Sequence, residues 1–371
     1  MTDPDDLLPT GLEDALPVRA AAITRAMRQV LDAMDSHGYD RVRPPLVEFE
    51  ASLSGRMKGV ATRRMVRFTD PESLRTLALR SDMTVQVGRI AATSLRAAPR
   101  PLRLAYAGDI ALLSADQLDP ARQRLQMGAE LVGSDSVEAV SEVLGVALDA
   151  LTAAGIGGVS VDFTLPDLVD TLARDALPLE EGQIEAVRRE LDAKDAGGLV
   201  AIEDGEAYLP LLYAAGAFDE AMGKLAAIDA KGVLKSRIAG LRAIAGTIGS
   251  RVRLTLDPSE RHGFEYQDWI GFTLYAEGAR GALGRGGAYR IKGSEECATG
   301  FSLYMEPMLE ALGEAAPEPR DTLFLPPGHD RDAAARLRAI GWRTVAARGE
   351  GDDAKARGCT HRLEGDEVVQ P

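Results

Sequence analysis

Cysteine and histidine are scarce in this chain of 371 residues. The two cysteines, Cys297 and Cys359, lie far apart in the sequence and fit neither a disulfide framework nor a zinc-binding pattern. The four histidines include no pair spaced four residues apart and have no carboxylate cluster at metal-ligand spacing, so we expect neither a metal nor another cofactor. Reduced thiols of this kind are typical of a cytoplasmic protein.

Long apolar runs and an excess of basic residues are also missing. No apolar segment approaches the roughly 20 residues that span a bilayer, and the acidic N-terminus lacks the order of a signal peptide. The net charge of −14, from 57 acidic and 43 basic residues, argues against broad binding to nucleic acid or to an anionic membrane. The remaining composition, 45% hydrophobic and 27% charged, is typical of a globular protein.

The first part of the chain alternates helix and strand signals. Apolar residues at helical spacing predict a helix over 18–36, started by Pro17 and ended by Gly38. The Pro44-Pro45 pair confines the next extended segment to a sheet edge or a crossover. The sequence pattern next predicts a hairpin of 65–70 and 74–82, with its turn at 70–73, and a helix from about 83 to 97. Strands are predicted at 101–113 and 125–135, and a further helix at 136–156.

The composition changes after a predicted strand at 158–163. Residues 166–248 are almost all helix formers, and strand signals return only at 251–258, 263–278 and 281–290. This order predicts a sheet-based domain, residues 1–317, that carries a helical insertion at about 166–248. A short strand, helix and strand pattern from Asp321 onward predicts a small α/β module over residues 318–371.

A glycine-rich segment, Gly284-Arg285-Gly286-Gly287, precedes a strand that leads into a helix at residues 300–312. Such a junction is a common place for a nucleotide site. However, the segment has neither the GxxxxGK[ST] pattern nor a following βαβ unit, so a phosphate loop is excluded. We expect these glycines to let two strands approach closely. Pro307 fits the first turn of the helix, where its missing N–H needs no partner.

Five segments in order resemble the class II aminoacyl-tRNA synthetase core, specifically that of histidyl-tRNA synthetase. They resemble more closely its non-aminoacylating relative, the regulatory subunit of ATP phosphoribosyltransferase. The similarity runs from about Leu8 to Leu312 and rests on residues 38–51 (motif 1), 79–92, 103–135 (motif 2), 262–276 and 298–312 (motif 3). It implies an α+β fold in which helices flank an antiparallel sheet, with a motif 1 homodimer.

The departures from the synthetase pattern concern the groups that hold ATP. Adenylation needs fixed cations around the developing charge on the phosphate. At the four positions where the family has arginines, this sequence has Leu112, Pro120, His262 and Pro307, and an acidic companion falls at Ser114. The resemblance therefore implies a protein with no catalytic residues for aminoacylation.

The amino-acid side of the site is better preserved. The resemblance implies a histidine-binding set made of Asp82, Thr84, Arg122, Gln126, Glu130 and Tyr266. A carboxylate and a hydroxyl suit an ammonium group, while a second carboxylate with an amide suits an imidazole. Each residue also has a plainer interpretation: Asp82 and Thr84 as a helix cap, Gln126 and Glu130 as an exposed strand face, Tyr266 as a core aromatic, and Arg122 as a structural residue. In addition, Gln267 replaces a tyrosine of the family signature.

Three functions follow from these observations. The favoured one is a non-catalytic regulatory subunit that forms a hetero-oligomer with the short-form catalytic ATP phosphoribosyltransferase, acts in the first step of histidine biosynthesis, and responds to histidine. A working histidyl-tRNA synthetase is disfavoured by the missing arginines, the acidic charge and the short C-terminal part. A stand-alone histidine-binding or tRNA-binding paralogue remains the third possibility.

Overall fold

The computed structural model describes residues 7–54, 65–113, 120–229, 231–261, 267–291, 294–313 and 321–370. The chain divides into two compact units, Met1–Gly313 and Glu314–Pro371. Each unit has its own sheet and its own apolar core. Within the described ranges, no helix combines the length and apolarity that crossing a bilayer requires.

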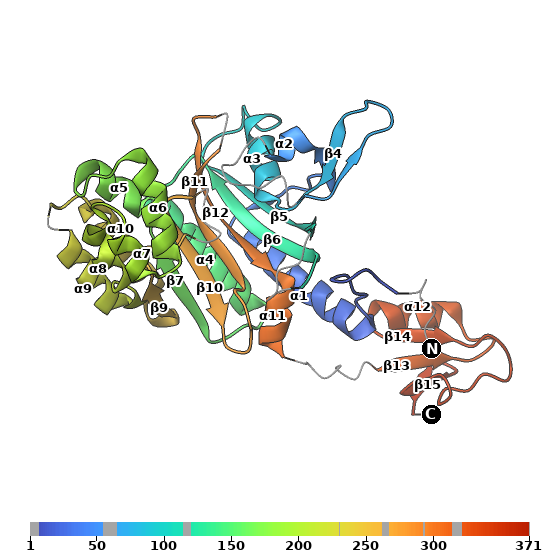
Figure 1. Cartoon of the computed structure of the whole chain (residues 1–371). Helices are drawn as coiled ribbons and strands as arrows, with labels where there is room; N and C mark the ends of the chain where they lie inside the picture. The colour runs from blue at the N-terminus through green and yellow to red at the C-terminus, as the bar shows by residue number, and fades with distance from the viewer. Residues whose placement is uncertain are drawn as a thin grey trace. The chain divides into compact units, whose positions relative to one another are not determined.

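The first unit is built on a large, mainly antiparallel sheet (Figure 1). In the described ranges its strands follow the order β1 (Asp40–Arg41), β5 (Leu102–Ala111), β6 (Gln123–Val132), β12 (Cys297–Tyr304), β11 (Gly284–Arg290), β10 (Gln267–Ala276), β7 (Val159–Thr164), β9 (Arg253–Leu256) and β8 (Gly216–Ala217). Among the described strand pairs of this sheet, only β1–β5 and β7–β9 are parallel. The antiparallel sheet with flanking helices confirms the predicted fold class.

One face of this sheet is covered by helices α1 (Pro17–Ser36) and α4 (Val137–Ala153). Alternate residues of β6, namely Met127, Ala129 and Leu131, join the apolar core on this side. Because side chains alternate along a strand, the residues between them face the opposite side of the sheet. Both helices were predicted from their apolar spacing, and α4 is also capped by Ser136, whose hydroxyl accepts a hydrogen bond from the Ala139 N–H.

The opposite face of the sheet carries α3 (Thr84–Ala92), whose Met83–Val87 segment packs against β5. Beside it lies a small antiparallel sheet of β2 (Val47–Phe49), β4 (Thr76–Leu79) and β3 (Arg67–Thr69), with helix α2 (Glu50–Ser54). The Pro44-Pro45 pair lies on the crossover from β1 to β2, as predicted, and the buried Arg80 guanidinium donates to the Pro44 and Asp109 carbonyls.

Helix α3 is shorter than the sequence predicted, because it ends at Ala92 rather than near residue 97. Arg100 explains this end. Its guanidinium donates to the carbonyl oxygens of Ala91, Leu95 and Ala98, and the Ala91 carbonyl is one that a helix continued to residue 97 would have used internally. The expected helix therefore stops early, and a compact turn follows it.

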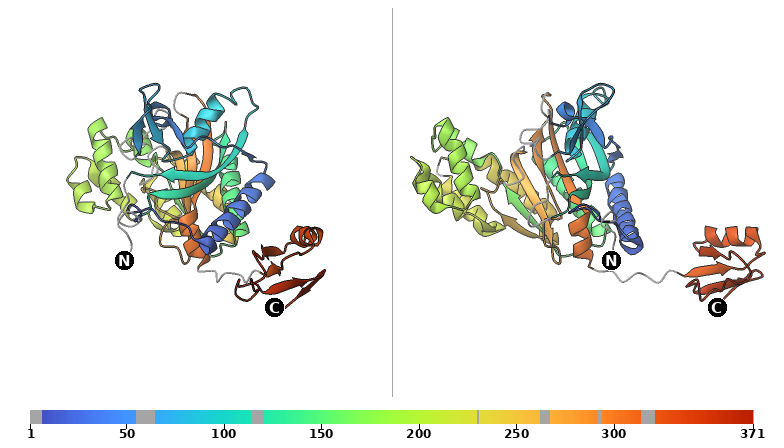
Figure 2. Two further views of the ribbon diagram at one scale, coloured as in Figure 1. Left: turned by 90° about the vertical axis from the view of Figure 1, so that its right-hand side faces the viewer. Right: turned by 45° about the vertical axis from the view of Figure 1, so that its right-hand side comes forward.

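The helical insertion leaves the sheet after β7 and returns through β9. Its described elements are α5 (Leu168–Asp175), α6 (Glu181–Asp192), α7 (Ala196–Val200), the 3-10 helix η3 (Gly205–Tyr208), α8 (Leu209–Leu212), α9 (Phe218–Ile228), α10 (Lys235–Ile248) and the 3-10 helix η4 (Gly249–Arg251). Figures 1 and 2 show these helices, coloured green to yellow, gathered beyond β7 and β9.

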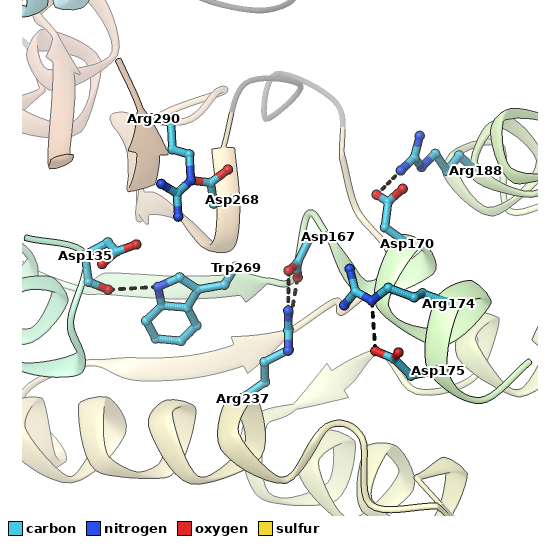
Figure 3. Close-up of polar contacts among 10 residues, drawn as sticks. All are labelled: Asp135, Asp167, Asp170, Arg174, Asp175, Arg188, Arg237, Asp268, Trp269 and Arg290. Atoms are coloured by element: carbon cyan, nitrogen blue, oxygen red, sulfur yellow. Dashed lines mark hydrogen bonds and ion pairs between the residues drawn. The ribbon is translucent and has the colours of Figure 1, made fainter. Parts of the chain in front are cut away.

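Polar contacts hold the insertion and the loops beside it (Figure 3). Arg237 of α10 pairs with Asp167, which precedes α5, and the Arg237 Nε–Asp167 Oδ1 distance is 3.0 Å. Trp269 of β10 donates its indole N–H to the carbonyl of Asp135 at 2.9 Å, just before α4. The first contact joins α10 to the start of α5 within the insertion, and the second joins β10 to the start of α4.

The second unit has a mixed sheet of its own in the order β14 (Arg343–Ala346), β13 (Thr322–Leu325), β15 (His361–Glu364) and β16 (Glu367–Val369). Helix α12 (Arg331–Ala339) connects β13 to β14 and buries Ala334 against Leu323 and Leu325. The strand, helix and strand pattern was predicted. Strands β15 and β16 were not predicted, because they are short and rich in charged residues.

Candidate ligand-binding site

The centre of the candidate site is on β6, on the face opposite the main core. Gln126 and Glu130 project from this face and are 0% and 1% exposed. The interpretation of these two residues as an exposed strand surface is therefore wrong. A buried carboxyl group and a buried amide need hydrogen-bond partners, so the surrounding residues determine what this site does.

Two strand glycines make room for the buried polar groups. Gly128 lies between Gln126 and Glu130, and a β-carbon there would lie 2.5 Å from the Tyr106 hydroxyl. Gly300 of β12 is the direct partner of Glu130, and a β-carbon there would overlap the Glu130 carboxylate. The missing side chains thus let Tyr106 and the Glu130 carboxylate lie flat against the sheet.

The Glu130 carboxylate is held by neutral hydroxyl groups. Tyr106 of β5 donates to Glu130 Oε1 at 3.1 Å, and Tyr289 of β11 donates to Glu130 Oε2 at 2.9 Å. The Tyr106 hydroxyl also lies 3.1 Å from Thr84 Oγ1 and 3.0 Å from Ser302 Oγ. These contacts draw four strands and α3 together around one carboxyl group.

Burial raises the pKa of Glu130 to about 8. The hydrogen bond from Tyr289 opposes this rise, and the negative charge of nearby Asp82 adds to it. Near neutral pH the carboxyl group therefore holds a proton for much of the time in the empty site. A cationic group placed beside it would favour the carboxylate form instead.

Asp82, Thr84 and Gln126 form the second part of the site. Asp82 Oδ1 accepts from the Thr84 N–H at 2.7 Å and from Gln126 Nε2 at 3.1 Å. Gln126 also accepts from the Met83 N–H at 2.8 Å and donates to Ser302 Oγ at 2.8 Å. Asp82 thus closes the turn before α3, in line with the plainer interpretation, and at the same time belongs to the buried network.

Arg122 is a predicted site residue that makes none of the described hydrogen bonds of this cluster. Arg122 precedes β6, where its Nε lies 3.4 Å from the Leu112 carbonyl and its N–H donates to the Gly11 carbonyl at 2.8 Å. None of its described hydrogen bonds goes to Asp82, Gln126 or Glu130. Tyr266 lies outside the described residues, as do His262 and Ser114.

The positions that should clamp ATP carry no cation in the described part of the site. The Leu112 N–H donates to the carbonyl of Arg122 at 2.8 Å, two residues after Pro120 in the sequence. Pro307 is the third residue of helix α11 (Met305–Leu312), where a missing N–H is tolerated. An aliphatic or proline side chain cannot stabilise charge on a phosphate, so these positions do not support adenylation.

Sequence reasoning missed three members of the cluster: Tyr106, Tyr289 and Ser302. Each occurs in a strand whose pattern is typical of core packing, and only strand pairing brings them together. Tyr289 follows the glycine-rich segment, so that segment contributes to the site through its neighbour rather than as a phosphate loop. Gly286 instead allows close approach, because a β-carbon there would collide with the Phe272 ring.

The described residues contain no group of three or more histidine, cysteine, aspartate and glutamate side chains arranged to hold a metal ion. The cluster offers carboxyl, amide and hydroxyl groups, which are suited to an ammonium or another N–H donor. The arrangement can therefore bind a small polar molecule through hydrogen bonds.

Comparisons with known proteins agree with this picture. The histidyl-tRNA synthetase family model matches residues 11–308. The chain is 40% identical over 373 residues to the ATP phosphoribosyltransferase regulatory subunit of Rhodospirillum centenum, covering 98% of this chain and 96% of the relative. It is 41% identical over 375 residues to the protein of the same name from Paramagnetospirillum magneticum, covering 98% and 97%.

Solved structures show the same fold. An ATP phosphoribosyltransferase regulatory subunit/histidyl-tRNA synthetase from Bacillus halodurans has a TM-score of 0.82 at 23% identity, covering 96% of this chain and 97% of the other. A histidyl-tRNA synthetase from a Nostoc species has a TM-score of 0.76 at 15% identity, covering 96% and 90%. The matched names and the fold confirm the resemblance identified from the sequence motifs. The chain belongs to the ATP phosphoribosyltransferase regulatory subunit family, which shares the histidyl-tRNA synthetase fold.

Proposed function

We propose that histidine binds this regulatory subunit at Asp82, Thr84, Gln126 and Glu130, and that binding changes the activity of a catalytic ATP phosphoribosyltransferase subunit in the same complex. The observation that carries the proposal is the state of Glu130. It is buried, and within the described residues its donors are hydroxyls rather than cations. A ligand with an imidazole ring would supply the missing partner.

The rest of the cluster fits the other end of an amino acid. Asp82 is only half-buried and accepts from the Thr84 N–H, so its carboxylate is available to an ammonium group, while the Thr84 hydroxyl lies 3.1 Å from the Tyr106 hydroxyl. Arg122 and Tyr266 remain predicted contacts in this proposal. A protein that binds histidine without an ATP clamp has no use for the ligand as a substrate, so the ligand is expected to act as a signal.

Binding regulates a partner only if the ligand has different affinities for two states of the complex. A coupling of about 1–3 kcal/mol is typical for such effects. The proposal also places the complex in the cytoplasm, in keeping with the two free cysteines.

The test is a histidine titration of ATP phosphoribosyltransferase activity in complexes made with wild-type or Glu130→Gln subunit. We expect the variant to assemble and turn over normally without histidine, and to need at least about tenfold more histidine for the same effect. Glu277→Gln, at an exposed carboxylate far from β6, should behave as wild type. Superimposable titration curves for wild type and Glu130→Gln would rule out this site as the histidine sensor.

A further inference from the structure

The second unit carries an exposed isoleucine at the end of helix α12. Ile340 follows the last residue of the helix and is 76% exposed. One exposed apolar side chain is ordinary on a protein surface. Here, however, Ile340 and the half-buried Trp342 line the same cavity, which has a volume of about 600 Å³. The two residues therefore belong to an apolar surface that is hollowed rather than flat.

The end of α12 holds this surface in place. Gly341 has a φ of 105°, which glycine adopts without strain. Its N–H donates to the Arg338 carbonyl at 3.0 Å, and the Trp342 N–H donates to the Leu337 carbonyl at 3.0 Å. These are the two hydrogen bonds of a Schellman motif, in which the residue after the glycine packs on the last turn of the helix. Trp342 accordingly packs with Leu337 against the apolar core of this unit.

Three exposed arginines accompany the apolar residues. Arg336 lies one helical turn before Ile340, Arg338 lies in the last turn of α12, and Arg343 lines the cavity. Within the part of the chain that the structure describes, none of the three forms an ion pair. Asp321 is the one acidic residue among the described residues that line the cavity. The chain carries a net charge of −14, so this surface is a local basic patch on an acidic protein.

Trp342 adds a hydrogen-bond donor to the cavity wall. Its indole ring packs edge-on against the imidazole of His361, with the ring centroids 4.9 Å apart. Among the described residues, the indole N–H has no hydrogen-bond partner, and this group can only donate. The surface thus combines apolar side chains with positive charge and N–H donors, and it calls for an occupant with an apolar group and acceptor oxygens.

We propose that this surface docks an acidic segment of a partner protein. One large apolar side chain of that segment packs between Ile340 and Trp342, and its carboxylates pair with Arg338 and Arg343. Tryptophan and arginine are the residues that most often anchor protein interfaces, and guanidinium groups pair well with carboxylates. This inference is independent of the proposed histidine binding, because it concerns only the second unit.

Two other occupants match the surface less well. If two copies of the chain paired through the same surface, arginines would face arginines, and like charges in contact oppose association. A nucleic acid would satisfy the arginines through its phosphates, but these polar groups would leave the Ile340 side chain without an apolar partner. An acidic segment with an apolar side chain satisfies both features.

The first experiment selects ligands from a library of random peptides displayed on phage, with the full chain as bait. The selected peptides should combine aspartate or glutamate with a large apolar residue. A fluorescent copy of one of them should bind the full chain in an anisotropy titration, and more weakly at high salt, because salt screens charge pairs. A selection that yields no peptide, or only basic or uncharged peptides, would overturn the proposal.

The second experiment measures binding of that fluorescent peptide to variants of the full chain. Ile340→Asp removes the apolar contact and adds a negative charge, so the peptide should bind about 10- to 100-fold more weakly. Arg343→Glu should weaken binding about tenfold. Ile340→Val keeps an apolar side chain and should bind within about threefold of wild type. Val200→Asp, at a residue of α7 that is 54% exposed, is the matched control and should bind as wild type does.

The remaining outcomes identify a wrong occupant. A peptide that binds Ile340→Asp and Arg343→Glu as tightly as wild type occupies another site, which would overturn the proposal. Single-stranded oligothymidine that binds wild type more tightly than the peptide, and is lost in Arg343→Glu, would show a nucleic-acid surface instead. Self-association of wild type that Ile340→Asp abolishes in sedimentation velocity runs would identify the occupant as a second copy of the chain.

Discussion

Glu130 and Gly300 are direct partners across β6 and β12, and the carboxylate of one occupies the space where the other would carry a β-carbon. The buried acid therefore depends on a residue that contributes no side chain. Tyr106 and Gly128 are also direct partners, and the Tyr106 hydroxyl lies where a β-carbon on Gly128 would come too close. The polar cluster is therefore built over two glycine positions of neighbouring strands.

Gly300→Ala should destabilise the fold. The new methyl group would force the Glu130 carboxylate out of its position, and overpacking of this kind costs about 1–3 kcal/mol. Urea unfolding measures the effect. Gly223→Ala is the matched control, because this exposed glycine of α9 has no atom within 4 Å of a β-carbon, and alanine is favoured in a helix by about 0.5–1 kcal/mol. A Gly300→Ala protein as stable as wild type would show that the carboxylate does not need this space.

Glu130 should make stability depend on pH in a defined direction. Its pKa is about 8 in the folded protein and near 4.5 when unperturbed, so the folded state binds the proton more tightly. Between these values the unfolded state carries fewer protons at this site, and the stabilisation from the protonated acid is lost as pH rises. The slope for one group is at most about 1.4 kcal/mol per pH unit.

Comparison with Glu130→Gln isolates that contribution. The free energy of unfolding of wild type minus that of the variant should decrease from about pH 5 to about pH 8. Denaturant unfolding at several pH values gives this difference directly. A difference that is constant or increases over the same range would mean that the carboxyl group ionises freely in the fold.

The protein should not form histidyl-adenylate. Leu112, Pro120 and Pro307 cannot neutralise a phosphate, and the loss of even one charge-stabilising group typically lowers a rate about 100- to 1,000-fold. Histidine-dependent exchange of pyrophosphate into ATP should equal the no-protein control, while an active histidyl-tRNA synthetase run in parallel gives a clear signal. Exchange above background would contradict the interpretation of these positions.

We also expect a homodimer with an isologous interface in the absence of the catalytic subunit. This expectation rests on the motif 1 resemblance of residues 38–51, in which β1 is an edge strand and Leu46 is 44% exposed. Leu46→Asp should weaken the dimer in sedimentation velocity runs. Ile340→Asp, at a residue that is 76% exposed in the second unit, should leave it intact. A wild-type monomer at micromolar concentration would refute the motif 1 assignment.

Much of the fold was predictable because its signals are local. The apolar spacing and Pro17 predicted α1, and a similar apolar pattern before Gly155 predicted α4. The order of the motifs also led to the prediction that Asp82, Gln126 and Glu130 belong to one binding site. The helix predictions succeed because a helix face depends on residues close together in the sequence, whereas ligand binding by that set stays a prediction.

The end of α3 and the composition of the site depended on distant residues instead. Arg100 donates to the Ala91 carbonyl, which a longer helix would have used, and to the Leu95 and Ala98 carbonyls in the turn that follows. Tyr106 and Tyr289 reach Glu130 only through the register of strands far apart in the chain. Register follows from the whole sheet, and a shift of one residue would turn each side chain to the other face. For the same reason, the burial that raises the pKa of Glu130 could be known only once the strands and α3 were assembled around it.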